Sequence, residues 1–127
     1  MVRHVLDEAG GQTGIPPERR VLVGFSQAVA LNYRFASTYP DAIRGVIAIC
    51  GGLPGDWDSG AYQPIQASVL HIASREDEYY PVDKTAAYPE ALHRHASDVE
   101  FQLIDGGHRM PGSASSIVMP WMRRILS

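Results

Sequence analysis

The chain has 127 residues, of which 45% are hydrophobic and 20% are charged, and this composition is ordinary for a single globular domain. The formal net charge is −3, and the basic residues form no run longer than the pairs Arg19–Arg20 and Arg123–Arg124. This charge pattern excludes the electrostatic footprint of a protein that binds nucleic acid or a membrane surface, so neither partner is expected.

The first half of the chain is predicted to alternate between helices and strands. VLVGF and RGVIAICGG are apolar runs that are too short and too continuous for amphipathic helices, and this pattern is typical of buried strands. The predicted order is a helix, a loop, a strand, a helix and a second strand, over residues 1–9, 12–18, 21–25, 27–38 and 44–52.

The second half continues this alternation after the long turn-rich loop GLPGDWDSGAYQPI. Two prolines fall inside predicted helices, where Pro89 should break or restart its helix and Pro120 should kink or restart the last one. The predicted elements are a strand, an acidic loop, a helix, a strand and a helix, over residues 67–74, 75–81, 82–95, 99–107 and 113–126.

Strands that alternate with helices form right-handed βαβ units, and such units build a parallel sheet. We therefore expect one α/β domain over residues 1–127, with a parallel sheet of about four strands and flanking helices. Ligands of such sheets bind at the carboxyl ends of the strands. The residues that follow each predicted strand are therefore the first candidates for a functional site.

A serine stands where the first predicted strand becomes a helix. Gly24-Phe25-Ser26-Gln27-Ala28 fits the G-x-S-x-G pattern, with alanine in place of the last glycine. In that pattern a tight strand-to-helix turn exposes the serine hydroxyl, and the small residues on either side let the strand and the helix approach each other. Ser26 is therefore a candidate nucleophile, although the motif alone is a weak signal.

A carboxylate and an imidazole follow two later strands. Asp77 lies in the acidic loop, with Pro81 four residues further on, and a pair of glycines leads into His108 after the fourth strand. The chain order serine, aspartate, histidine, each after its own parallel strand, is the order of the α/β-hydrolase triad. The sequence leaves open whether Asp77 or Glu76 is the acid.

The cysteine and the other histidines do not suggest a metal or a cofactor. Cys50 is the only cysteine, so no internal disulfide is possible, and it is expected to be a small buried side chain. His93 and His95 would point to different sides of a helix, and His71 is expected to pack within its strand. No glycine loop of the P-loop or dinucleotide-binding type occurs, so we expect neither a metal nor a cofactor.

The N-terminal segment carries no targeting signal. MVRHVLDEAGG is too polar for a signal peptide. No apolar stretch approaches the roughly 20 residues that span a bilayer. A cytoplasmic location is therefore expected.

Together these residues resemble the phospholipase/carboxylesterase family, the serine esterases related to acyl-protein thioesterases, over essentially the whole chain. The resemblance implies that Ser26 is the nucleophile, His108 the general base and acid, and Asp77 the acid that orients the imidazole. It also implies that the amide of Gln27 is one oxyanion donor. The motifs that carry the resemblance are Gly24-Phe25-Ser26-Gln27-Ala28, Cys50-Gly51-Gly52-Leu53-Pro54, Val69-Leu70-His71-Ile72 leading to Asp77, and Gly106-Gly107-His108.

Apolar and aromatic residues after the second and third strands are candidates for contact with an ester substrate. Leu53, Trp57 and Tyr62 stand on the long turn-rich loop, and Tyr79 and Tyr80 stand in the acidic loop. These side chains would either line the acyl or alcohol pocket or cover the edge of the sheet. The sequence does not choose between the two alternatives.

The chain departs from the resembled family in length, because family members are usually much longer and carry strands before its first helix. It therefore resembles the C-terminal half of an α/β hydrolase, as an N-terminally truncated domain would. One edge of VLVGF should then be unpaired, apolar and flat, which predicts a homodimer or a partner that covers this edge. One oxyanion donor should also be missing, which lowers turnover by about 10²–10³.

The resemblance implies a serine hydrolase that cleaves small carboxylic esters or thioesters through an acyl-enzyme. One alternative is a catalytically weak or inactive hydrolase half that acts as a subunit or binding module. The short length favours that alternative, and the presence of all three triad residues disfavours it. Another alternative is a different enzyme on the same scaffold, such as a thioesterase, a peptidase or a dienelactone-type hydrolase, although the last type favours cysteine where this chain has Ser26.

Overall fold

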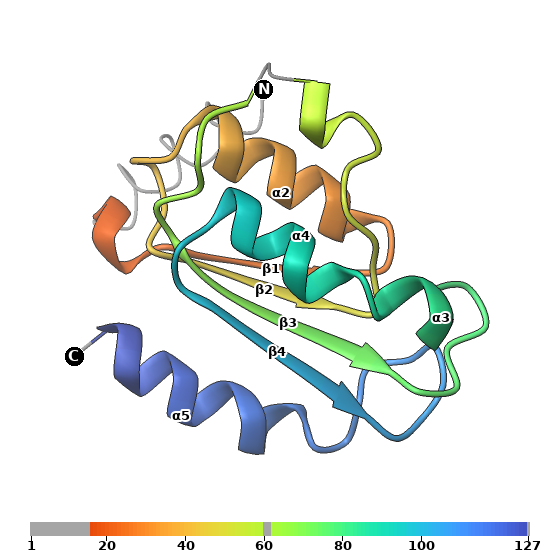
Figure 1. Cartoon of the computed structure of the whole chain (residues 1–127). Coiled ribbons are helices and arrows are strands. Elements are labelled where there is room, and N and C mark those ends of the chain that lie inside the picture. The colour runs from red at the N-terminus through yellow and green to blue at the C-terminus, as the bar shows by residue number, and fades with distance from the viewer. Residues whose placement is uncertain (1–15, 60–61, 127) are drawn as a thin grey trace.

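The computed structural model describes residues 16–59 and 62–126, and its architecture is a parallel sheet between two layers of helices (Figure 1). The helix expected over residues 1–9 lies outside the described residues. The described elements, including two 3-10 helices (η), are η1 (Pro17–Arg19), β1 (Val21–Phe25), α2 (Ala28–Thr38), β2 (Gly45–Ile49), η2 (Trp57–Ser59), β3 (Ser68–Ser74), α3 (Val82–Thr85), α4 (Tyr88–His95), β4 (Val99–Ile104) and α5 (Ala114–Leu126).

The four strands pair in the order β1-β2-β3-β4, and all three pairings are parallel. α2 and α4 cover one face of the sheet and α5 covers the other (Figure 1). This arrangement confirms the predicted α/β fold with a four-stranded parallel sheet. It also places the loops that follow the strands at one rim, where the candidate residues of the sequence are found.

The two prolines inside predicted helices behave differently. A short break separates α3 from α4, and Pro89 lies in the first turn of α4, where its missing N–H costs no intrahelical hydrogen bond. Pro89 therefore restarts a helix, as predicted. α5 runs unbroken through Pro120, so a restart there is wrong. The buried Trp121 and Ile125, which pack against the sheet after Pro120, keep the second half of α5 in line with the first.

The sheet has an apolar core on each face. β2 and β3 are buried along their whole length, as expected for central strands of a covered parallel sheet. Val29, Tyr33 and Leu92 belong to the core under α2 and α4, and Trp121 and Ile125 to the core under α5.

β3 also carries a fully buried histidine, His71, which packs within the strand as predicted. Its Nδ1 lies 2.6 Å from the Tyr33 hydroxyl, and its ring stacks on Phe101 with centroids 5.6 Å apart. Burial lowers the pKa of His71 to about 4, so the imidazole is neutral at neutral pH. His71 is therefore part of the packing between α2 and the sheet.

β1 is an edge strand of the described sheet, because within residues 16–59 and 62–126 it pairs with β2 alone. Val23, at the middle of β1, exposes 59% of its surface. The free edge that the sequence predicts for VLVGF is therefore present in the described structure.

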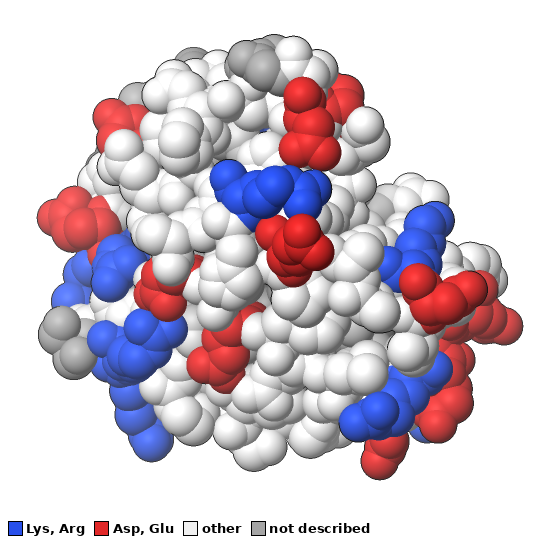
Figure 2. Space-filling model, viewed as in Figure 1, with Lys and Arg blue, Asp and Glu red and all other residues white. Residues whose placement is uncertain are grey.

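The surface carries charges of both signs. In Figure 2, acidic and basic side chains lie interspersed in small groups on the face shown, with no large field of one sign. Exposed ion pairs join Arg34 to Asp56 and Arg75 to Asp105, each at 3.1 Å. Among the helices of the described residues, none is long and apolar enough to cross a bilayer.

Candidate active site

The turn between β1 and α2 holds Ser26 in a strained backbone conformation. Its φ is +61°, a left-handed value that costs a residue with a side chain on the order of 1–3 kcal/mol. The Ser26 N–H donates to the Ile49 carbonyl at the end of β2 (3.0 Å), and the Ser26 carbonyl accepts from the Val29 N–H (3.2 Å). These bonds hold a sharp turn that points the hydroxyl away from strand and helix, as the motif predicts.

Two glycines make this turn possible. A Cβ on Gly24 would lie 3.2 Å from the backbone of Ala28, which would push β1 and α2 apart. A Cβ on Gly51 would lie 2.3 Å from the Val29 Cβ and 2.6 Å from the Ser26 carbonyl oxygen. Gly24 belongs to the motif, whereas the need for Gly51 depends on a contact between segments distant in sequence and was not predicted.

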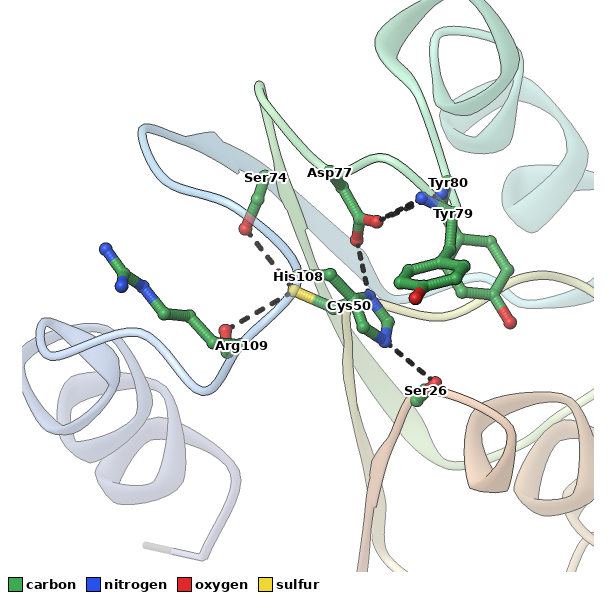
Figure 3. A network of polar contacts seen from close by, with 8 residues as sticks. All are labelled: Ser26, Cys50, Ser74, Asp77, Tyr79, Tyr80, His108 and Arg109. Carbon is green, nitrogen blue, oxygen red and sulfur yellow. Dashed lines mark hydrogen bonds and ion pairs between the residues drawn. The ribbon is translucent and has the colours of Figure 1, made fainter.

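The structure brings the three triad candidates together at the rim of the sheet (Figure 3). His108 Nε2 lies 3.0 Å from Ser26 Oγ, and His108 Nδ1 lies 3.0 Å from Asp77 Oδ2. The side chains of Asp77 and His108 are only 1% and 14% exposed. With the Nδ1–H tautomer, this chain of hydrogen bonds leaves Nε2 free to accept the serine proton.

Asp77 is held as an ionised carboxylate. Burial raises its pKa, but hydrogen bonds from His108 and from the backbone N–H groups of Tyr80 and Tyr79 outweigh that effect, and the net pKa is lowered. The two N–H groups donate to Oδ1 at 3.0 and 2.9 Å, which leaves Oδ2 for the imidazole. The carboxylate is therefore both charged and fixed in direction.

Glu76, the alternative acid, makes different contacts. Its carboxylate accepts the Gly106 N–H at 2.7 Å, and its own N–H donates to the Gly106 carbonyl at 2.9 Å. Gly106 has a φ of +126°, which favours glycine. The loop after β3 thus binds the loop that carries His108, while Asp77 is the carboxylate that contacts the imidazole.

A cleft of about 290 Å³ opens at the site and is lined by Ser26, Gln27, Tyr79, Tyr80 and His108. The Tyr79 ring meets the His108 ring edge to face, with centroids 4.7 Å apart, and Tyr79 remains 65% exposed. Gln27 is the residue before the first turn of α2, so its N–H belongs to the positive end of the helix. Of the predicted substrate contacts, Tyr79 and Tyr80 line this cleft.

The other predicted substrate contacts lie elsewhere. Trp57 is 4% exposed, stacks on His95 with centroids 4.0 Å apart, and donates its indole N–H to Ser37 at 2.9 Å. Leu53 packs against the same core. The Tyr62 hydroxyl donates to an Asp56 carboxylate at the surface (2.9 Å). These contacts anchor the long loop on α2 and α4, outside the cleft.

Cys50, at the end of β2, is buried beside the triad. Its φ is +51°, and its Sγ lies 3.3 Å from Ser74 Oγ and 3.7 Å from the Arg109 carbonyl (Figure 3). Burial raises the pKa of its thiol. The ligand atoms of Cys50, Asp77 and His108 all lie within 4.8 Å of one another, and in the described part of the chain no other trio of this kind was found. The buried position of Cys50 was predicted, but its place beside the imidazole was not.

Comparison with known proteins finds one family model and several solved structures. Residues 1–124 match the model of the phospholipase/carboxylesterase family. A search of curated proteins finds no match. The solved structures that match include SOBER1 from Arabidopsis thaliana (21% identity, TM-score 0.84), the Bacillus cereus carboxylesterase (17%, 0.80) and esterase PE8 (24%, 0.83).

These structures share the fold with the chain over almost all of its length. The matches cover 98–99% of this chain but only 61% of the Arabidopsis thaliana protein, 58% of the Bacillus cereus carboxylesterase and 59% of esterase PE8. The chain therefore spans about three fifths of the length of each structure.

Proposed function

Because the chain belongs to the phospholipase/carboxylesterase family, we propose that it is a serine hydrolase that cleaves small carboxylic esters or thioesters through an acyl-enzyme on Ser26. The observation that supports this function most strongly is the continuous hydrogen-bonded chain from the Ser26 hydroxyl through both nitrogens of His108 to Asp77. A merely structural contact would not require the nucleophile to occupy a strained turn with its hydroxyl at the rim.

In the proposed reaction, Ser26 Oγ attacks the carbonyl carbon of the ester while His108 Nε2 accepts the hydroxyl proton. Asp77 keeps the other imidazole proton on Nδ1 and stabilises the cation that forms. His108 then protonates the leaving alcohol or thiol, and an acyl-enzyme remains. Water repeats the sequence on the acyl-enzyme, with His108 again as base and then as acid.

The negative charge of the tetrahedral intermediate needs hydrogen-bond donors. The Gln27 N–H is the first of these, since it lies next to Ser26 at the N-terminus of α2, where the helix dipole favours an anion. The backbone N–H groups of Tyr79 and Tyr80, which also line the cleft, already donate to Asp77 and do not serve as the second. Loss of one such donor lowers turnover by about 10²–10³, so the Gln27 N–H alone would support slow turnover of activated esters.

The cleft favours small substrates. At about 290 Å³ it lies at the lower end of ligand pockets, and its lining combines the polar groups of Ser26, Gln27 and His108 with two tyrosine rings. Short acyl groups would fit against Tyr79 and Tyr80, whereas a long lipid chain would have to extend beyond the described cleft. We therefore expect a preference for short acyl esters.

A fluorophosphonate probe tests the proposed nucleophile directly. Peptide mass spectrometry of the labelled chain should find the probe on Ser26, and neither Ser26→Ala nor His108→Ala should be labelled. Ser97→Ala and His93→Ala are matched controls, since both residues are exposed and outside the cleft, and both variants should label like the wild type. Hydrolysis of p-nitrophenyl acetate should show the same pattern: it should be lost in Ser26→Ala and His108→Ala and retained in both controls. Labelling at another residue, or equal labelling of His108→Ala, would disprove the proposed role of Ser26.

A second candidate is an inactive hydrolase portion that acts as a subunit. One observation favours it: β1 has a free edge in the described structure. This candidate predicts no probe labelling and no ester hydrolysis above Ser26→Ala. Labelling of Ser26 in the isolated chain would eliminate it.

A further inference from the structure

A sulfur, an oxygen and a nitrogen atom that can each bind a metal lie close together at Cys50, Asp77 and His108. Nδ1 of His108 is 3.0 Å from Asp77 Oδ2, and the Cys50 thiol joins these groups within 4.8 Å (Figure 3). We propose that Cys50, Asp77 and His108 form an inhibitory binding site for a thiophilic divalent cation such as Zn²⁺. The inhibition rests on the proposed hydrolase function, whereas the binding site does not.

The donor set fits zinc better than a hard cation. Thiolate, imidazole and carboxylate are the three common protein ligands of Zn²⁺, whereas Mg²⁺ and Ca²⁺ prefer oxygen alone. Zinc–ligand bonds of about 2.0–2.3 Å in tetrahedral geometry place the donor atoms about 3.5 Å apart. The Asp77 and His108 atoms already lie close to this spacing, so mainly Cys50 has to approach, by up to about 1.3 Å.

The thiol is weakly held in its present position. Its contacts with Ser74 Oγ at 3.3 Å and with the Arg109 carbonyl at 3.7 Å are long and involve sulfur, which is a weak donor and acceptor. A metal ion would replace the thiol proton, which passes to solvent. The exchange therefore gives up weak interactions and forms a metal–thiolate bond.

A route for the ion lies on the same side. A polar cavity of about 100 Å³ borders both Ser74 and Arg109, the two residues that contact the thiol, and the glycines that lead into His108 form part of its lining. A cation could therefore reach Cys50 without passing through the cleft beside Ser26. Substrate would approach His108 from the cleft, and the cation would approach the Cys50 site from the side of this cavity.

Metal at Nδ1 would stop the proposed reaction for a simple reason. A neutral imidazole carries one proton, and a cation on Nδ1 keeps that proton on Nε2. Nε2 then donates a hydrogen bond to Ser26 Oγ and can no longer accept its proton. The cation also takes Asp77 Oδ2 away from the imidazole. Both effects remove the general base without displacing any residue of the cleft.

The first test compares inhibition by Zn²⁺ in matched variants. ZnCl₂ is titrated into the full chain during p-nitrophenyl acetate hydrolysis in a buffer that does not chelate metals, with MgCl₂ as the hard-cation control. Each variant is compared with its own uninhibited rate. Cys50→Ser should raise the half-inhibiting concentration of Zn²⁺ by at least about 10–100-fold, because even a change to a residue that only supports the metal ligands weakens affinity by that order. His93→Ala, which removes an exposed histidine outside the cluster, should leave it unchanged. Equal inhibition of Cys50→Ser and wild type would overturn the proposal.

The second test does not depend on activity. Co²⁺ bound by a thiolate gives a near-ultraviolet charge-transfer band, which should appear when CoCl₂ is added to the wild-type chain and to Ser26→Ala. The band should be lost in Cys50→Ser and in His108→Ala. No band in the wild type would overturn the site whatever the variants do. A band without any ester hydrolysis would support the metal site and contradict the proposed hydrolase function. Hydrolysis without a band would support the hydrolase function and contradict the metal site.

Discussion

β3 and β1 each deliver one end of the proposed triad, but they do so from very different surroundings. β3 is paired on both sides and all seven of its residues are buried, whereas β1 is paired on one side and exposes 59% of Val23. Asp77 follows β3, and Ser26 follows β1. The proposed acid thus follows an interior strand of the sheet, and the proposed nucleophile follows an edge strand of the described sheet.

The loops that follow the strands differ in the same way. The loop after β3 is joined to the loop after β4 by the Arg75 N–H on the Ile104 carbonyl, at 2.8 Å, and by two hydrogen bonds between Glu76 and Gly106. The turn that holds Ser26 depends instead on one backbone bond to the end of β2 and on close contact with Gly51. Substitutions in the two regions should therefore have different effects. Those in the loops after β3 and β4 should impair proton transfer, and those at the turn of Ser26 should change the shape of that turn.

The largest effect is expected for Asp77→Asn. The asparagine oxygen still accepts the backbone N–H groups of Tyr79 and Tyr80, but its NH₂ group would face Nδ1 and favour the wrong tautomer of His108. Turnover of p-nitrophenyl acetate should fall by about 10⁴, as for the equivalent change in a serine protease triad. Thermal unfolding should show the fold intact. Glu78→Gln, an exposed neighbour in the same loop, is the control, and a loss smaller than tenfold in Asp77→Asn would argue against an orienting role.

The next largest effect belongs to the nucleophile half. Gly51→Ala places a Cβ 2.3 Å from the Val29 Cβ and 2.6 Å from the Ser26 carbonyl, so the turn must shift. We expect a destabilisation of about 1–3 kcal/mol from overpacking. A shift of Ser26 by about 1 Å should slow fluorophosphonate labelling by about 10².

Gly55→Ala is the matched control, since a Cβ there meets nothing within 4 Å. Denaturant unfolding gives the stability of each variant, and labelling rates at equal folded fraction separate the shape of the turn from global stability. If Gly51→Ala labels as fast as Gly55→Ala, then the turn does not depend on this contact.

The order of elements could be predicted from the sequence because each depends on local pattern. VLVGF and GVIAI are continuous apolar runs, and both form parallel strands as predicted. GVIAI is buried along its length, but the burial predicted for VLVGF was wrong, because β1 lies at the edge of the described sheet and Val23 is exposed. The restart at Pro120 was wrong because the decisive contacts, those of Trp121 and Ile125 with the sheet, are tertiary.

The order of the candidate residues along the chain was enough to predict that they lie together. Ser26, Asp77 and His108 follow their own strands, and parallel pairing brings strand ends together. The choice of Asp77 over Glu76 was not available, since two neighbouring carboxylates differ only in the direction that the turn gives them. Trp57 could not be placed either, because an aromatic residue on a loop gains equally from lining a pocket and from joining the core.

A smaller effect is expected for Glu76→Ala, which removes one link between the two loops of the acid–base half. The Gly106 N–H would lose its acceptor at 2.7 Å, and the loop that carries His108 would gain freedom. Turnover should fall by about tenfold, less than for a full 1 Å misplacement. Glu76→Gln should restore most of the loss, because its amide oxygen can accept the same N–H. Equal losses in both variants would show that the charge of Glu76, rather than its hydrogen bond, matters.

The smallest effect on turnover, and the clearest on assembly, is expected at the free edge of β1. The Ser26 N–H donates to Ile49, and the Arg20 carbonyl accepts from the N–H groups at the start of β2. Backbone groups of successive residues in a strand point to opposite sides, so those of Val21, Val23 and Phe25 point away from β2. This edge carries no charged residue between positions 21 and 25. In an antiparallel pairing centred on Val23, Val21 would lie opposite Phe25 of a second copy, and all paired side chains would be apolar.

We therefore predict a dimer of the chain that joins two sheets through β1. Light scattering should show a mass that rises with concentration, and Val23→Lys should remain monomeric, because a charged edge residue opposes strand pairing. Since Val23 is largely exposed, the variant should keep its stability within about 0.5 kcal/mol. Leu31→Lys is the matched control, as Leu31 is 51% exposed on α2 and away from the edge. If both Val23→Lys and Leu31→Lys are monomeric, the dimer contact includes the helix layer. If the wild type stays monomeric at all concentrations, an apolar free edge is insufficient for pairing.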